Sequence, residues 1–196
     1  MTDFSQLPYQ RPNFERVKHQ YHQLLTTFQR ADDPLTATQA ALLLAELNER
    51  VASQQMLATI RFSVNTLDAF YSGENDYWND YGPKYDELVA DCYRALVASP
   101  FQAELKQIFP ETLFKVAANQ VKTFSAQNIP LQQAENKLTS RYAKLIATAE
   151  IDFAGETYTL PQMNKFSSDR DRTKRQAAAQ ATTAWYVEHE AEFDEI

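Results

Sequence analysis

The chain has 196 residues and a net charge of −7, with only three glycines and one cysteine. A chain of this length can bury a sizeable apolar core, and so few glycines argue against an all-β fold with its tight turns and bulges. The negative charge repels phosphate groups, which excludes nucleic acid and anionic membranes as general partners. The N-terminal residues are polar and no window reaches membrane-spanning hydrophobicity, so we expect a cytoplasmic protein with no membrane contact.

Apolar residues at helical spacing predict a mainly α fold of long antiparallel helix hairpins and shorter helices. An amphipathic helix over 13–30 comes first. Asp33 is suited to cap the next helix, and Pro34 to its first position. We expect this second helix to run to about Gly73, with its antiparallel partner over 74–98.

Proline and glycine mark the boundaries of the following elements. Gly82-Pro83 is expected to break or bend the helix over 74–98. Two shorter helices are predicted over 100–108, with Ser99 as N-cap, and over 110–123. Residues 128–149 form a further amphipathic pattern, which predicts another helix.

The hydrophobic period then changes from helical to alternating. Residues 151–160 alternate apolar and polar side chains around Gly155, which predicts one small β-hairpin. Pro161 is expected to close this hairpin. A last helix follows, capped by Ser167 or Ser168.

The chain divides at the joint formed by residues 124–130. We expect a helical N-terminal lobe over 1–124, and over 125–196 a helix, the hairpin and a final helix. That final helix still shows an apolar face at Ile196 and has no C-capping signal. We therefore expect a truncated helix that leads to an absent catalytic domain.

No complete catalytic or metal site can be assembled from the sequence. His189-Glu190 resembles the start of a zinc-peptidase helix, but the second histidine position is Phe193. His19 and His22 lie three residues apart with no third ligand at fixed spacing, and an exposed helix face is the simpler interpretation. We expect no catalytic residue and no metal ligand in this chain.

One polar stripe is a candidate peptide-binding wall. Arg61, Asn65, Asp68 and Tyr71 are spaced three or four residues apart, as on one face of the long helix. In a cleft, an arginine binds carboxylate, and asparagine and tyrosine bond to peptide backbone. The alternative is a solvated face with an internal Arg61–Asp68 network, and both interpretations stay open.

Three segments together resemble one enzyme family. They are ENKL at 135–138, IDFAGETYTL at 151–160 and SSDRDR at 167–172. The stretch IRFSVNTLDAFYSGENDYWNDYGP at 60–83 is similar to an earlier helix hairpin of the same family. In this combination and order, the chain resembles the N-terminal half of the oligoendopeptidase F family, zinc metallopeptidases related to thimet oligopeptidase.

The resemblance implies a helical lobe that faces a catalytic lobe across a deep channel, which short peptides enter and in which they are cut. It places the zinc motif downstream, so zinc is expected in the full-length protein and not in this chain, which alone is expected to be inactive. The implied partners are short peptides and the missing C-terminal catalytic domain. The alternative is a non-catalytic helical module that binds peptides or a protein partner.

Overall fold

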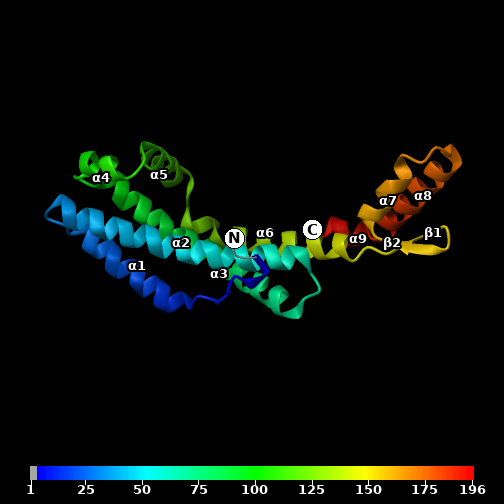
Figure 1. The fold of residues 1–196 in the computed structure, drawn as a ribbon, viewed down its shortest axis with the longest axis horizontal. Helices are drawn as coiled ribbons and strands as arrows, with labels where there is room; N and C mark the ends of the chain where they lie inside the picture. Colours follow the sequence, from blue (N-terminus) through cyan, green and yellow to red (C-terminus); the bar gives the residue numbers. More distant parts are fainter. Residues whose placement is uncertain (1–3) are drawn as a thin grey trace.

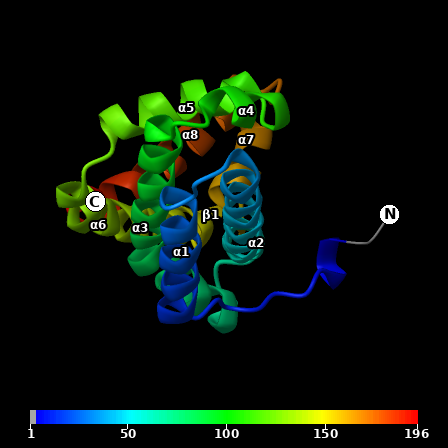
Figure 2. The ribbon, with the colours of Figure 1, turned by 90° about the vertical axis from the view of Figure 1, so that its left-hand side faces the viewer.

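The computed structural model describes residues 4–196 as an elongated, mainly helical molecule with one small β-hairpin. This confirms the predicted fold class. Figure 1 shows a helical lobe at one end, a long helix leading out of it, and a smaller unit at the other end. Figure 2 looks along the long axis of the molecule. In this view the N-terminal segment projects from one side of the lobe, and the C-terminus is on the other side.

The larger lobe contains the first five α-helices. A short 3₁₀ turn, η1 (Phe4–Gln6), precedes them. The helices are α1 (Phe14–Gln29), α2 (Pro34–Val64), α3 (Ala69–Ala98), α4 (Gln102–Ile108) and α5 (Glu111–Thr123).

The second part begins with a 3₁₀ turn, η2 (Ala126–Asn128), and the connecting helix. Its elements are α6 (Ile129–Ala147), β1 (Ile151–Phe153), β2 (Glu156–Tyr158), α7 (Leu160–Ser167), α8 (Arg172–Glu188) and α9 (Glu190–Asp194).

Two separate hydrophobic cores correspond to these two parts. The core of the lobe is built from α1 to α5 and includes the fully buried Tyr21 and Leu105. The smaller core lies between the hairpin, α7 and α8 and contains Ile151, Phe166 and Trp185. Each part therefore has its own apolar interior, and α6 runs between them (Figure 1).

The predicted start of α2 is confirmed, but its predicted end at Gly73 is wrong. Asp33 Oδ1 accepts hydrogen bonds from the backbone N–H groups of Leu35 and Thr36, as an N-cap does. The helix ends at Val64 because Asn65 Oδ1 accepts from the N–H of Leu67, a local bond that competes with the helix. Gly73 lies inside α3.

The predicted break at Gly82-Pro83 is also wrong, because α3 continues through both residues. Pro83 has no N–H to bond the carbonyl of Asn79. Two amides from α6 reach this stretch: Asn136 Nδ2 donates to the Asn79 carbonyl at 3.5 Å, and Gln133 Nε2 donates to the Asp80 carbonyl. Packing of α6 thus supplies donors where the proline removes one.

The boundary of α4 differs from the prediction, and that of α5 agrees with it. Phe101, not Ser99, is the N-cap of α4, and Ser99 Oγ instead accepts from the N–H of Phe101. Pro110 precedes α5 as expected.

The predicted hairpin is confirmed, with antiparallel pairing from Ile151–Tyr158 to Phe153–Glu156. Ala154 and Gly155 both have positive φ, at 55° and 86°, which is the backbone of a tight two-residue turn. Glycine adopts this conformation without the strain that other residues incur.

The elements after the hairpin differ from the prediction. The hairpin ends at Tyr158, and Pro161 lies in the first turn of α7, which Thr159 and Gln162 open with a reciprocal capping box. Asp171, rather than Ser167 or Ser168, caps α8. The final helix is interrupted at His189, and α9 follows.

A buried polar contact fastens α6 to α3. Asn75 Nδ2 and Asn79 Nδ2 both donate to Ser140 Oγ, at 2.8 and 2.9 Å, and this hydroxyl donates in turn to the carbonyl of Asn136. All three side chains that meet here, Asn75, Asn79 and Ser140, are buried. Buried amides need such acceptors, because an unpaired one retains its full desolvation cost.

We expect Ser140→Ala to lower the free energy of unfolding by about 1–3 kcal/mol, because it leaves two buried amides without their acceptor. Urea unfolding followed by circular dichroism measures the change. Thr139→Ala is the matched control, since Thr139 is the exposed neighbour on the same helix, and it should have little effect. Equal stability of the two variants would contradict the structural role of this contact.

Candidate functional site

The turn between α2 and α3 brings together the residues of the predicted polar stripe. Arg61 is in the last turn of α2 and Tyr71 in the first turn of α3. Arg61 Nη1 donates to Tyr71 Oη at 2.7 Å, and Nη2 donates to the backbone carbonyls of Leu7 at 2.6 Å and Phe4 at 3.3 Å. The guanidinium thus binds main-chain oxygens of the chain's own N-terminal segment.

Asn65 and Asp68 are capping residues at this turn. Asn65 is the C-cap of α2 and Asp68 the N-cap of α3, with Asp68 Oδ1 accepting from the N–H of Tyr71 at 3.0 Å. The interpretation of the four residues as one face of a single helix is therefore wrong. They still lie around one turn, and their role in substrate binding stays a prediction.

A buried carboxylate lies one helical turn beyond Tyr71. Glu74 is only 4% exposed. Arg11 binds it through two parallel hydrogen bonds, Nη2 to Oε1 at 2.6 Å and Nε to Oε2 at 2.8 Å. Tyr9 Oη donates to the same Oε2 at 2.5 Å and accepts from Trp78 Nε1 at 3.1 Å. This forked arrangement is among the stronger pairings available to a carboxylate.

The electrostatics follow from these contacts. The hydrogen bonds from Arg11 hold the pKa of Glu74 below its ordinary value of 4.5, against the opposing effect of burial. Burial and the neighbouring carboxylate raise the pKa of Tyr9, so its hydroxyl stays protonated and remains a donor. The guanidinium of Arg11 also lies 4.8 Å from the centre of the Tyr77 ring. The network therefore holds the N-terminal segment onto α3 in one protonation state near neutral pH.

Sequence reasoning missed Glu74 as the centre of this network. Its partners Tyr9 and Arg11 are 65 and 63 residues away in the chain, so no local spacing connects them. The sequence does contain a dense run of aromatic residues from Phe70 to Tyr85 on the same stretch as Glu74. In the structure several of these rings pack edge to face with Tyr9 or Phe14.

Apolar side chains are exposed around the same turn, and we call this set the apolar turn surface. Val64 is 82% exposed and Leu67 76% exposed. The set also includes Met56, Ile60 and Phe70, all exposed. Met56, Ile60 and Val64 are four residues apart on α2 and so form one stripe. Clustered apolar exposure of this kind marks an interaction surface.

The described residues do not fit a zinc ion. Zinc requires three or four nitrogen, sulfur or carboxylate ligands, and residues 4–196 contain no group of three such side chains that could hold a metal. The ring of His189 instead stacks on Trp185 with centroids 4.4 Å apart, and its Nδ1 lies 2.9 Å from the Trp185 carbonyl.

Among residues 4–196, no helix is long and apolar enough to cross a membrane.

Comparison with known proteins identifies the class. Residues 4–124 match the family described as Peptidase M3 N-terminal domain. The chain therefore belongs to the Peptidase M3 N-terminal domain family and is an N-terminal part of a peptidase. No curated protein sequence matches it.

Three solved structures share the fold and much of the sequence. A structure of PZ peptidase A with an inhibitor is 38% identical over 98% of this chain, with a TM-score of 0.93. An X-ray structure named as an oligoendopeptidase F is 38% identical over 100% of it, with a TM-score of 0.94. One named oligoendopeptidase F from Bacillus anthracis is 35% identical over 97%, with a TM-score of 0.92.

These matches confirm the resemblance to oligoendopeptidase F. The chain spans only 34%, 34% and 35% of the three matched chains.

We expect Glu74→Gln to lower the free energy of unfolding at pH 7 by about 1–3 kcal/mol, because it removes the charged acceptor of Arg11 and Tyr9. Since the folded-state pKa of Glu74 lies below 4.5, this stabilisation is complete above pH 4.5. It is lost as the pH falls toward the folded-state pKa. The difference between the variant and the parent should therefore shrink on acidification.

Urea unfolding at a series of pH values measures this difference. Glu49→Gln is the control, because Glu49 is exposed on α2. A pH-independent difference for Glu74→Gln would contradict the charge-based explanation.

Proposed function

We propose that this chain is the N-terminal, substrate-channel-forming part of a zinc metalloendopeptidase that cleaves short peptides. The observation that carries the proposal is the match of residues 4–124 to a peptidase N-terminal domain. The likeness to two structures named oligoendopeptidase F, over 97% or more of this chain, supports it further. In this proposal the chain shapes the channel, while the zinc and the catalytic residues belong to a catalytic half absent from it.

The apolar turn surface supports the existence of such a partner lobe. Val64 and Leu67 are largely exposed to water at the turn between two capped helices, and covering such apolar side chains is favourable. The matched structures are about three times as long as this chain. We assign the missing catalytic domain as the cover of this surface.

Arg61, Asn65, Asp68 and Tyr71 remain our candidates for peptide contact at the channel wall. The support is chemical: Arg61, the partner of Tyr71, binds two backbone carbonyls of the N-terminal segment, those of Phe4 and Leu7. A short unstructured peptide offers the same backbone carbonyl groups.

A cytoplasmic location is part of the proposal, because the single cysteine suits a reducing compartment.

We expect the isolated chain to hydrolyse no peptide and to bind no zinc stoichiometrically. The protein expressed with the downstream continuation of its reading frame should cleave a short fluorogenic peptide, and a chelator should abolish that activity. Metal analysis and a peptide-cleavage assay on both proteins measure this. One tightly bound zinc per isolated chain, or no chelator-sensitive activity in the longer protein, would refute the proposal.

We expect Arg61→Ala to weaken the binding of a short, unstructured, fluorescently labelled peptide about tenfold, the size of one lost charge-assisted hydrogen bond. Fluorescence anisotropy gives the Kd. Arg50→Ala is the matched control on the same helix, because exposed Arg50 donates to Gln20 Oε1 at 3.4 Å and lies away from the α2–α3 turn. Equal Kd values for the two variants would remove Arg61 from the peptide-binding wall.

If the isolated chain bound peptides and its longer form never cleaved them, the alternative of a non-catalytic binding module would hold instead. The two experiments therefore separate the enzyme from the module.

A further inference from the structure

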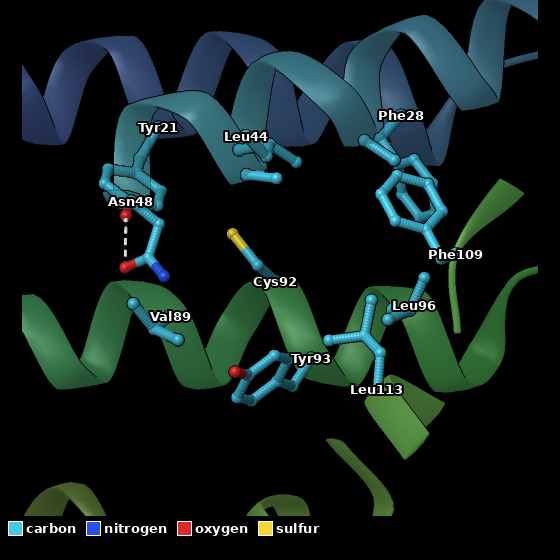
Figure 3. Close-up of a pocket in the computed structure, with 12 residues that line it drawn as sticks. Tyr21, Phe28, Leu44, Asn48, Val89, Cys92, Tyr93, Leu96, Phe109 and Leu113 are labelled. Atoms are coloured by element: carbon cyan, nitrogen blue, oxygen red, sulfur yellow. Dashed lines mark hydrogen bonds between the residues drawn. The ribbon is translucent and has the colours of Figure 1, made fainter. Parts of the chain in front are cut away.

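A cavity of about 120 Å³ lies inside the helical lobe, away from the α2–α3 turn and independent of the function proposed above. Figure 3 shows it between α1 and α2 on one side and α3 on the other. Leu44 from α2 and Val89 from α3 form facing walls, and Phe109 and Leu113 close one end. The Cys92 sulfur points from α3 toward α2, into this space (Figure 3).

The cavity exists because small side chains occupy facing positions. Ala41 and Ala45 on α2 and Cys92 on α3 leave space that the larger neighbours do not fill. An unfilled apolar space is unfavourable, because the atoms that line it lose dispersion contacts. A ligand of matching shape recovers those contacts.

The size of the cavity selects a single ring. An engineered apolar cavity of about 150 Å³ in another protein takes up benzene or xenon and stays dry when empty. The present cavity is slightly smaller. A two-ring or branched ligand would have to displace its walls.

The lining selects a neutral ligand. None of the twelve residues around the cavity carries a charge at neutral pH, and most are aliphatic or aromatic. Burial raises the pKa of the Cys92 thiol to about 12, with a smaller effect from Asp91, so the sulfur is an uncharged, polarisable contact. A charged ligand would lose its hydration without finding a partner.

A polar group at one end gives the ligand an orientation. Asn48 Oδ1 accepts from Tyr21 Oη at 3.3 Å, a long bond that leaves the amide able to serve another partner. Ala45 is exposed, so the cavity has access to the surface next to this pair. A ring with one hydroxyl or N–H matches an apolar chamber with a single polar end.

We propose that this cavity is a binding site for a small neutral aromatic molecule of one ring with a single polar substituent, of which phenol is the simplest probe. The ring lies between Leu44, Val89 and Cys92, and the polar substituent points toward Asn48.

The test measures the Tm of the chain as phenol is added, with benzoate and benzylammonium as charged analogues of similar size. We expect a saturable rise in Tm with phenol and none with the charged analogues. Ala41→Leu, which fills the cavity, should abolish the rise. Ala52→Leu should leave it unchanged, because Ala52 is an exposed residue of the same helix outside the cavity.

A second measurement uses the single cysteine and does not depend on any variant folding. Phenol at ten times its Kd should slow modification of Cys92 by a small neutral methanethiosulfonate about tenfold, because only the unoccupied protein reacts. Unchanged labelling together with no shift in Tm would overturn the proposal. So would an equal effect of benzoate, or an undiminished effect in a folded Ala41→Leu variant.

Discussion

The arrangement of this molecule depends on α3 remaining one continuous helix across Pro83. A proline inside a helix costs about 3 kcal/mol or more, since a hydrogen bond is lost and the ring crowds the preceding turn. Here that cost is met where α6 crosses, because Asn136 and Gln133 donate to the carbonyls of Asn79 and Asp80. The continuous helix packs against α1, α2, α5 and α6 along its 30 residues. A break at Gly82 would separate the turn near Glu74 from the helices that surround Cys92.

The same helix explains how the N-terminal segment is held. Glu74 would be an expensive buried charge by itself, and it is tolerated because Arg11 and Tyr9 satisfy both of its oxygens. The neighbouring Arg61 binds two carbonyls of the same segment from α2. Arg11 and Arg61 therefore both hold the N-terminal segment near the α2–α3 turn. Val64 and Leu67 at this turn stay exposed within the described chain.

The features that could be predicted from the sequence are those that neighbouring residues specify among themselves. Asp33-Pro34 and Ala154-Gly155 each specify a cap or a turn by residues that are adjacent in the chain, and both predictions are confirmed. The end of α2 was misplaced because helical spacing continues past Val64, while the Asn65 and Asp68 side chains compete with the helix for backbone donors. The α7 helix was missed although its capping pair, Thr159 and Gln162, stands in the sequence. The Glu74 network and the cavity depend on residues from distant elements, which no local pattern reveals.

The lobe has two unlike apolar features, the apolar turn surface and the cavity at Cys92. The apolar turn surface is exposed and made of large apolar side chains, which suits a permanent protein contact. The cavity at Cys92 is small and lined mostly by apolar side chains, which suits a single ring and no polypeptide. Under the proposed function a catalytic domain covers the first of these surfaces, whereas the second depends on small side chains inside the lobe, Ala41, Ala45 and Cys92.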